Sequence, residues 1–450
     1  MVTVLRRSAV ALLLIGFAAG SALAQTAPAP GQNPSLGFGM SLGIGVQTFN
    51  EPQPVTYQSL SLFPDLSFGK LGVGLAITVN YNFSGPGNSL YLRQADWVPT
   101  SFQNFLQIYL AKINYIRWGL KGDPLFLKLG SFDDVTLGDG FIVGGYTNMY
   151  FLPQDRHFGL EADVDGALFS FPYVGTETFA GNLALMDVLG GRFYIRPLAG
   201  TDAAVLKDMQ VGATLAVDTA SVNPLQSSTE PAAVAPGSPV YAYGGDIRFP
   251  LFAIKDTASM IAFTDVAAIQ SQTIGGAVGV SGRLVSIFTY GAQLRLMQAS
   301  FIPDYFGPLY DVSRQTYASY VSSGVTGSTF GYLVSLGTSL LGDKLVFTVT
   351  MDGPFSTTAT LASLQNPELR AVLSVAEGVV PGFFFSFSYD KQSITSLGDL
   401  ISRQNGSIAA QVSFKSGPAV ISFVYQLSYM PGQTPNPIIT SGLQSSVALF

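Results

Sequence analysis

The sequence predicts an all-β protein, a transmembrane antiparallel up-and-down β-barrel of about 18 strands, within a range of roughly 16 to 20. Only 11% of the 450 residues are charged although 48% are hydrophobic, whereas about 25% of the residues in ordinary soluble domains are charged. Beyond the N-terminus, no apolar run reaches the roughly 18 residues that a membrane-spanning helix requires. Apolar and small polar residues alternate instead, which is typical of strands with one face in lipid.

The N-terminus has the features of an export signal. Arg6 and Arg7 precede an apolar stretch over residues 9–19, and Ala22-Leu23-Ala24 follows as a small-x-small cleavage pattern. We therefore expect residues 1–24 to be a signal peptide that is removed from the mature chain.

After the signal peptide we expect a short periplasmic linker over residues 25–35 and a single transmembrane barrel domain over residues 36–450.

The composition limits the classes of protein to which the chain can belong. The chain contains no cysteine, so disulfides and thiolate metal sites are excluded. Export without disulfides is typical of a bacterial envelope protein. The formal net charge of −6 argues against a nucleic-acid-binding surface.

The first strands show the alternation most clearly. In residues 36–47 the even positions are apolar and the odd positions are mainly Gly and Ser. Residues 71–83 repeat the pattern with the opposite parity, and each segment is about as long as a tilted transmembrane strand, roughly 9–11 residues with overhang. A soluble β-sandwich would place Lys, Glu and Thr on its polar face, so Gly, Ser and Asn indicate a crowded, hydrated barrel interior. Further strands are expected at residues 55–63, 105–118, 124–132, 158–171, 179–187, 192–198, 209–218, 240–249, 259–269, 283–297, 330–340, 345–352, 369–376, 383–391, 407–415, 420–429 and 441–450.

The connections between these strands fall into two kinds. Tight turns of Gly, Asp, Lys and Pro occur at residues 121–124, 341–344 and 415–418. Longer connections, rich in Pro, Ser, Thr and Asn, occur at residues 84–104, 133–157, 219–239, 299–329, 353–367, 392–405 and 430–440. We therefore expect short periplasmic turns at one rim and long extracellular loops at the other.

The C-terminus provides a resemblance to a known class. Residues 443–450 alternate in hydropathy and end in Phe450, although Ser446 and Ala448, in phase with it, are small. This segment resembles the last strand of Gram-negative outer-membrane β-barrel proteins, whose terminal aromatic residue is the signal read by the barrel-insertion machinery. Together with the signal peptide and the strand pattern, it makes the chain similar to porin-like proteins. The resemblance implies a location in the bacterial outer membrane, with membrane lipid and the insertion machinery as partners.

Charged residues follow one parity within several strands. An Arg or Lys on the lipid face near the membrane midplane costs roughly 2–4 kcal/mol, so these rows should face the lumen. They could form an acidic and a basic wall that filters solutes, or ion pairs that hold the wall together. The expected pore-lining residues are Glu161, Asp163, Asp165, Arg192, Tyr194, Arg196, Asp246, Arg248, Arg283 and Arg295.

A gate has to come from a loop, because residues 25–35 are too few for a globular plug. The best candidate is the connection at residues 133–157, which combines hinge glycines with apolar residues that would be poorly placed in water. We expect it to pack inside the barrel or across its mouth, or else to extend the wall as a hairpin above the membrane. The expected gating residues are Phe141, Ile142, Tyr146, Met149, Tyr150 and Phe151.

Motifs for catalysis or cofactor binding are weak. The segment 138–143 begins like a dinucleotide-binding glycine motif but has Val143 in place of the last glycine. A hydrolase working near neutral pH would have to use His157, the only histidine in the chain. Asp133, Asp134 and Asp139 could offer oxygen ligands to a calcium-like ion, but they do not have the spacing of an EF-hand loop. We therefore expect neither an enzyme, a cofactor nor a metal site.

The function predicted from the sequence is passive or weakly selective passage of small solutes through an outer-membrane channel. Three alternatives stay open: a plugged barrel with a structural or surface-interaction role, an outer-membrane hydrolase using His157, and a transporter for hydrophobic substrates. The sequence does not identify the solute or the oligomeric state.

Overall fold

The computed structural model describes most of the expected barrel domain. The described residues are 36–50, 54–83, 89–150, 152, 155–202, 205–220, 239–254, 257–323, 326–341, 344–355, 367–402, 405–417, 419–428 and 438–448. The expected signal peptide and linker, Phe151 and Phe450 lie outside these residues.

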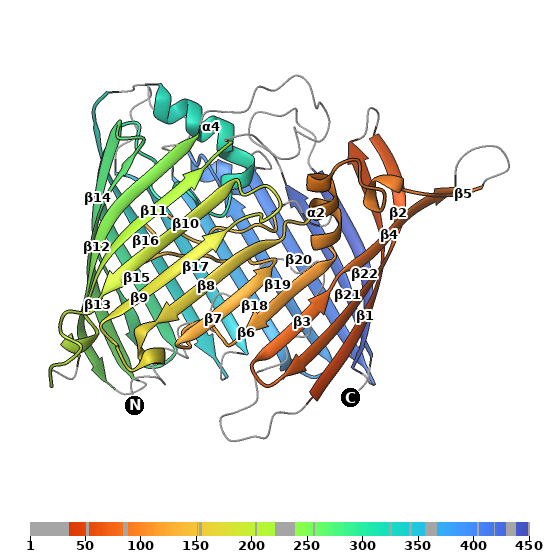
Figure 1. Ribbon diagram of the computed structural model, residues 1–450, viewed down its shortest axis with the longest axis horizontal. Coiled ribbons are helices and arrows are strands. Elements are labelled where there is room, and N and C mark those ends of the chain that lie inside the picture. Colours follow the sequence, from red (N-terminus) through yellow and green to blue (C-terminus); the bar gives the residue numbers. More distant parts are fainter. Residues whose placement is uncertain are drawn as a thin grey trace.

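Strands dominate the described chain (Figure 1). They are β1 (Leu36–Asn50), β2 (Pro54–Phe68), β3 (Leu71–Leu75), β4 (Ile77–Phe83), β5 (Leu90–Leu92), β6 (Ile113–Trp118), β7 (Leu125–Gly130), β8 (Gly159–Asp165), β9 (Val174–Ala180), β10 (Val188–Ile195), β11 (Gln210–Asp218), β12 (Val240–Ile254), β13 (Ala258–Ile269), β14 (Thr273–Leu284), β15 (Phe288–Gln298), β16 (Ser328–Leu340), β17 (Leu345–Pro354), β18 (Glu368–Val380), β19 (Phe383–Lys391), β20 (Gly406–Ser416), β21 (Ala419–Ser428) and β22 (Ile438–Ala448). The helices are α2 (Phe102–Leu110) and α4 (Tyr310–Ser322), with 3-10 turns η1 (Gln94–Asp96), η2 (Gly166–Phe169), η3 (Leu206–Asp208) and η5 (Leu397–Ile401). Neither α-helix is long and apolar enough to cross a membrane.

The strands close into a barrel. Neighbours along the chain pair antiparallel, and β1 pairs with β22 from Gly39↔Ala448 to Val46↔Ser441. Both β3 and β4 pair with β2, so they form one wall strand interrupted at Ala76, and β5 pairs only with the edge of β4. The described strands therefore make a closed antiparallel barrel of 20 strands. The all-β barrel prediction is confirmed, and the predicted count of 18 is two too low.

One missed strand has a clear physical reason. The sequence interpretation placed Arg283 and Arg295 on one strand, which is wrong, because Arg283 ends β14 and Arg295 belongs to β15. The turn between them contains Val285 and Ser286 at φ values of +52° and +62°. Turns of this left-handed type normally contain Gly, Asn or Asp, so the sequence carried no turn signal here.

Side chains alternate between an apolar exterior and a polar interior. On β10, Phe193 and Ile195 are exposed while Arg192 and Tyr194 are buried. The same alternation on β1 exposes Leu42, Ile44 and Val46. The outer surface is therefore an apolar belt of the kind that faces lipid.

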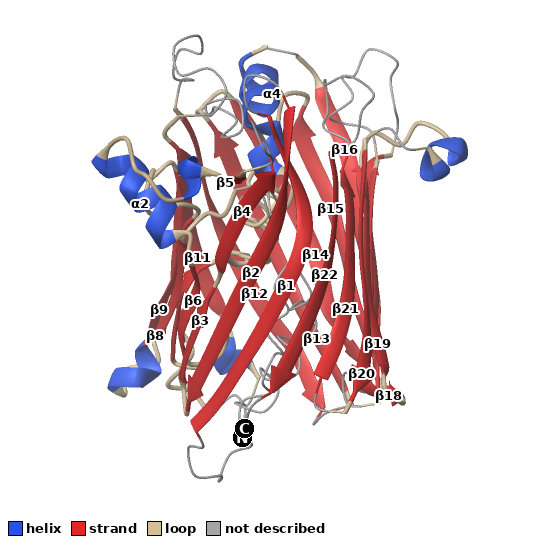
Figure 2. Ribbon diagram, turned by 90° about the vertical axis from the view of Figure 1, so that its right-hand side faces the viewer, coloured by secondary structure: helices blue, strands red, loops and turns tan. Residues whose placement is uncertain are grey.

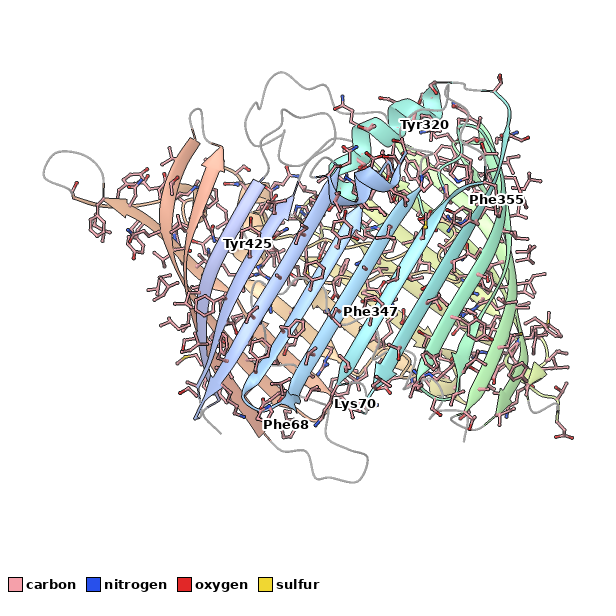
Figure 3. The ribbon with its side chains drawn as sticks, turned by 180° about the vertical axis from the view of Figure 1, so that it is seen from behind. Phe68, Lys70, Tyr320, Phe347, Phe355 and Tyr425 are labelled. Carbon is pink, nitrogen blue, oxygen red and sulfur yellow. The ribbon has the colours of Figure 1, made fainter. Side chains whose placement is uncertain are left out.

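The two rims differ in their connections. One rim has tight turns, for example residues 69–70, 285–287 and 381–382. The other has the long connections 131–158 and 299–327, and α4 lies at this rim (Figure 2). Exposed aromatic side chains occur near both rims, with Phe68 near the tight turns and Phe355 near the long connections (Figure 3). Aromatic rings are enriched at the two interfaces of membrane proteins.

Candidate functional site in the barrel lumen

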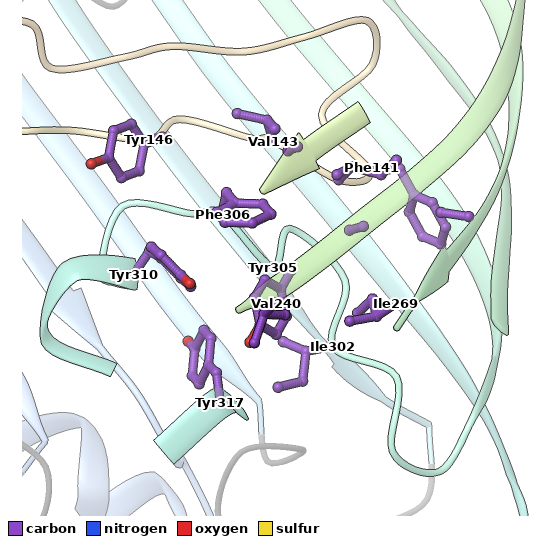
Figure 4. Close-up of a cluster of buried hydrophobic side chains, with 14 of the residues drawn as sticks. Phe141, Val143, Tyr146, Val240, Ile269, Ile302, Tyr305, Phe306, Tyr310 and Tyr317 are labelled. Atoms are coloured by element: carbon purple, nitrogen blue, oxygen red, sulfur yellow. The ribbon is translucent and has the colours of Figure 1, made fainter. Parts of the chain in front are cut away.

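Two long connections fold together inside the barrel. We name residues 131–158 the inner loop and residues 299–327, which contain α4, the helical loop. Within the inner loop, Val135 and Tyr146 exchange two backbone hydrogen bonds of 2.9 Å, which makes a hairpin. Val143 then pairs in parallel with Phe306, so the helical loop adds a third segment to this hairpin (Figure 4). The two loops therefore form one folded unit.

The hairpin tip depends on glycine. Gly138 and Gly140 have φ values of +59° and +88°, a region that other residues rarely adopt. A Cβ atom at Gly138 would lie 3.0 Å from the Nε atom of Arg192 on β10. The tip thus lies directly on the inner wall and leaves no space for a side chain.

A buried asparagine holds the base of the inner loop. The Asn148 Nδ2 atom donates hydrogen bonds of 3.0 Å to the carbonyl oxygens of Gly130 and Gly181. Its Oδ1 atom accepts a 2.9 Å hydrogen bond from the backbone N–H of Phe132. One side chain therefore satisfies three backbone groups of the loop and its neighbours, and a buried unpaired group would be costly.

Polar contacts hold the tip as well. The Gly138 N–H donates to the Glu177 Oε2 atom on β9 at 3.0 Å. The next residue, Asp139, forms an ion pair with Arg248 on β12, with 3.0 Å between Oδ1 and Nε. The inner loop is therefore attached to the wall at both its base and its tip.

The two loops share an apolar core with the wall. The strand residues of this cluster come from β9 to β15. Its buried members are Phe132, Val135, Leu137, Phe141, Ile142, Val143, Tyr146, Phe179, Val188, Ala216, Val240, Ala242, Ala267, Ile269, Ala277, Met297, Phe301, Ile302, Tyr305, Phe306, Tyr310, Tyr317, Tyr320 and Val321. Apolar burial of this size favours a fixed loop over one that moves freely in the lumen.

The expected gating residues lie on several sides of the loop. Phe141, Ile142 and Tyr146 belong to the apolar core, and Met149 is also buried. Tyr150 lines a cavity between the start of α4 and strands β19 and β20. The inner loop thus reaches from its own strands to the far side of the barrel.

A buried charge cluster fixes α4. The Arg314 Nη1 atom lies 2.7 Å from Asp187 Oδ2, and its Nε atom lies 3.4 Å from both Asp218 and Asp311. The hydroxyl of Tyr310 donates to Asp218 at 2.7 Å, and that of Tyr146 donates to Asp311 at 3.2 Å. We name Arg314, Asp187, Asp218 and Asp311 the latch. It joins α4 to β11, to the connection after β9 and to the inner loop.

The only histidine adjoins the latch. His157 is 4% exposed, with Nδ1 3.8 Å from Asp311 Oδ2 and Nε2 3.3 Å from Asp155 Oδ2. Burial by itself lowers the pKa of His157, but the charge and hydrogen bond of Asp155 outweigh burial. Together with the charges of Asp311 and Asp187, they raise this pKa to about 9. A cationic imidazole therefore helps to balance the latch carboxylates. Such a buried group is remote from any lumenal substrate, so this geometry does not favour the hydrolase alternative.

Most of the expected pore-lining charges form ion pairs. Arg192 is 1% exposed, and its Nη2 and Nε atoms contact Asp246 at 2.6 and 2.9 Å. Its Nη1 atom lies 3.3 Å from Glu177. Arg196 contacts Asp165 at 2.6 Å and the Tyr194 hydroxyl at 3.2 Å. These inward arginines are therefore covered by their partners.

The other residues that we expected to line the pore lie in different surroundings. Arg295 bridges Asp352 at 3.0 Å and Asp304 of the helical loop at 3.1 Å. Glu161 pairs with Lys121, and Asp163 lies near the same lysine. Arg283 stands apart from this group, since it donates to the Ser286 carbonyl at the rim of tight turns.

A small group of accessible charges was missed by the sequence reasoning. The side chains of Lys121 and Arg370 are each 31% exposed. Burial, together with the neighbouring Asp133 carboxylate, raises the pKa of Asp134 to about 6, while Arg370 and Lys121 act in the opposite direction. Both cations therefore lie near this carboxylate. We name Lys121, Asp134 and Arg370 the eyelet. Arg370 belongs to β18, which lies far around the barrel from β7, so nothing in the sequence indicated that these three residues would lie close together.

A cavity with about 240 Å³ of empty space lies between the inner loop and β11 to β13, lined by Phe141, Asp246 and Asp265 among others. Among the described residues, no group of three or more His, Asp or Glu side chains is arranged to hold a metal ion.

Comparison with solved structures finds outer-membrane barrels. OccK2 from Pseudomonas aeruginosa in complex with glucuronate has 8% sequence identity and a TM-score of 0.33, covering 93% of this chain and 100% of that one. The outer membrane protein OprD from the same organism has 11% identity and a TM-score of 0.32, over 94% and 95% of the two chains. Acinetobacter baumannii OccAB3 has 11% identity and a TM-score of 0.35, over 92% and 98%. No protein-family model and no curated protein matches the chain.

Proposed function

We propose that the protein is an outer-membrane channel for the passage of small solutes. The observation that carries this proposal is a closed barrel with an apolar exterior and a polar interior, narrowed by loops that are attached to one side of the wall. The long connections would face the cell exterior and the tight turns the periplasm. The chain would enter the membrane through the insertion machinery, with Phe450 as the assembly signal.

The path we propose runs past the eyelet. Lys121 and Arg370 are partly exposed, and Asp134 of the inner loop lies near both of them. Solutes passing between the inner loop and β18 would meet both signs of charge at this level, which gives weak selection among polar molecules. The inner loop acts as a fixed constriction because its apolar face is buried.

The test is single-channel conductance of the purified, folded barrel in planar bilayers. We expect stable openings, and a several-fold larger conductance when residues 137–144 are replaced by a short Gly-Ser turn. The control replaces η5 (Leu397–Ile401), whose Leu397 and Ile401 are highly exposed at the rim, and conductance should then stay unchanged. Absence of any stable opening from the folded protein would reject the channel.

One observation favours a second candidate, a plugged barrel with a structural role. The apolar core of the two loops packs against seven consecutive strands, β9 to β15. A plugged barrel would give no conductance before the loop replacement and openings after it. The same two recordings therefore separate the candidates.

A further inference from the structure

The barrel wall is discontinuous between β4 and β6. β3 pairs with β6 as far as Leu75↔Ile113. The strand continues as β4, which pairs with β2 on one side, but on the other side it pairs with β5 only from Tyr81↔Leu92 to Phe83↔Leu90. Among the described residues, 77–80 therefore have no ladder partner on that side. We name this stretch the seam.

The segment that follows β5 covers the seam. We name residues 93–112 the cover. The Arg93 N–H donates to the Asn80 carbonyl at 2.9 Å, and the Ala76 N–H donates to the Lys112 carbonyl at 2.7 Å. Backbone groups inside a bilayer have no water to bond, so they need protein partners. The cover supplies part of the pairing that a neighbouring strand would otherwise provide.

Polar side chains hold the cover in place. Asp96 forms an ion pair with Arg93, and its Oδ2 atom accepts a 2.9 Å hydrogen bond from Asn80 Nδ2. The Lys112 Nζ atom donates to the Asp96 carbonyl at 2.9 Å and lies 3.8 Å from the centre of the Trp97 ring. These contacts attach the cover to β4 and also hold the two ends of the cover together.

The outer part of the cover is α2, which is aromatic and uncharged. Phe102, Phe105 and Tyr109 are 77%, 42% and 38% exposed, and their spacing places them on one face of the helix. Their rings lie side by side, with centroids 6.4 Å and 4.8 Å apart. Figure 2 shows α2 outside the wall of strands. A helix with such a face and no charge is suited to the boundary between lipid headgroups and acyl chains.

The aromatic face continues the lipid-facing belt of the barrel. Phe83 at the end of β4 and Leu92 on β5 are also exposed. We propose that α2 docks on the membrane, with the acyl chains of the outer leaflet as its occupant, and so holds the cover over the seam. This inference rests on the proposed membrane location.

The test uses tryptophan fluorescence in the full-length barrel. The chain has two tryptophans, Trp97 and Trp118, and replacing both by Phe gives a silent background. Three single tryptophans are then introduced: Phe105→Trp on the aromatic face, Gln107→Trp on the opposite, exposed face, and Leu215→Trp on the belt of β11. Each is reconstituted in phosphatidylcholine vesicles whose acyl chains carry bromine. A heat-dependent gel shift verifies that each barrel is folded.

We expect bromine to quench Phe105→Trp roughly two-fold, close to Leu215→Trp, and to leave Gln107→Trp nearly unchanged. Quenching of Leu215→Trp without quenching of Phe105→Trp would overturn the docking of α2 and leave the channel proposal intact. Equal quenching of Phe105→Trp and Gln107→Trp would also overturn docking through the aromatic face. If Leu215→Trp is not quenched, the membrane location fails and both proposals fall with it.

Discussion

Between β9 and β18 the inner wall carries arginine and carboxylate side chains packed against two loops, whereas on β20, β1, β2 and β4 the described inward side chains are mainly Gly, Ser, Thr, Asn and Gln, with Asp65 on β2 as a charged exception. In the charged half, pairs such as Arg192 with Asp246 are covered by the inner loop. In the uncharged half, short side chains pair across strands, as Ser413 and Ser422 do at 2.8 Å. Charged side chains therefore serve to attach the loops. The small polar residues of the opposite wall project only a short way into the lumen and keep its surface hydrated.

The largest effect should come from breaking the latch of the charged half. Arg314→Ala leaves Asp187, Asp218 and Asp311 buried without their cation, which should cost about 3–5 kcal/mol. We expect the helical loop to be released, with faster proteolysis there and noisier channel recordings. Lys415→Ala is the matched control, because its pair with Glu377 is exposed at the rim and should cost under about 1 kcal/mol. Equal protease resistance of the two variants would contradict the role of the latch.

Alkaline pH should loosen the same half. The pKa of His157 is raised from 6.5 to about 9, so its stabilisation is fully present below pH 6.5 and is lost as pH rises through 9. The loss should approach about 3 kcal/mol. Loop proteolysis measured between pH 6 and 10 should therefore accelerate from about pH 6.5 to about pH 9 and level off above that. His157→Gln should remove this pH dependence, and a persisting one would assign it to another group.

The uncharged half should respond weakly. Ser413→Ala removes the hydrogen bond to Ser422 and a longer one from Gln411, each worth about 0.5–1.5 kcal/mol. Urea unfolding of the barrel in detergent should show this small change while protease resistance of the helical loop stays as in the parent. Release of that loop by Ser413→Ala would show that the two halves are coupled.

The smallest effect on stability should come from the eyelet, where Arg370→Gln removes a partly exposed charge worth under about 1 kcal/mol. It should nevertheless shift the reversal potential towards cations, because an accessible cation beside the path is lost. Arg192→Gln is the matched contrast, because Arg192 is covered by its partners. This substitution should destabilise the barrel but leave the ion selectivity of the folded fraction unchanged. The opposite result would place the path at Arg192.

Much of the barrel could be predicted because lipid imposes a period of two on every strand. Arg192 and Asp246, which were expected on inward rows, are buried and paired with each other, and their role in lining a pore stays a prediction. The strand count failed where a turn lacked glycine, at Val285 and Ser286, because the sequence pattern does not separate β14 from β15 there. A different error concerns the strand expected at residues 105–118, whose first part belongs to α2 and whose end forms β6. Helix and strand cannot be separated by periodicity in so short an aromatic run.

The site was less predictable, because its pairs join distant strands. Arg370 and Asp134 come together only through closure of the barrel, and Arg314 meets Asp187 from the connection after β9 and Asp218 from the end of β11. Composition did identify the inner loop, since its apolar residues needed a place away from water. It gave no indication that the helical loop would supply the other half of the core.

The pairing of Val143 with Phe306 also has a consequence for the order of assembly. The inner loop is made early in synthesis, but the segment that completes its core is encoded more than a hundred residues later, and closure of long sequence separations is slow. During export the first half of the chain would therefore expose an aromatic hairpin with no partner. In an outer-membrane protein such a hairpin would need shielding until the second half arrives, so we expect assembly of this barrel to depend on chaperone supply more strongly than that of a barrel with locally packed loops.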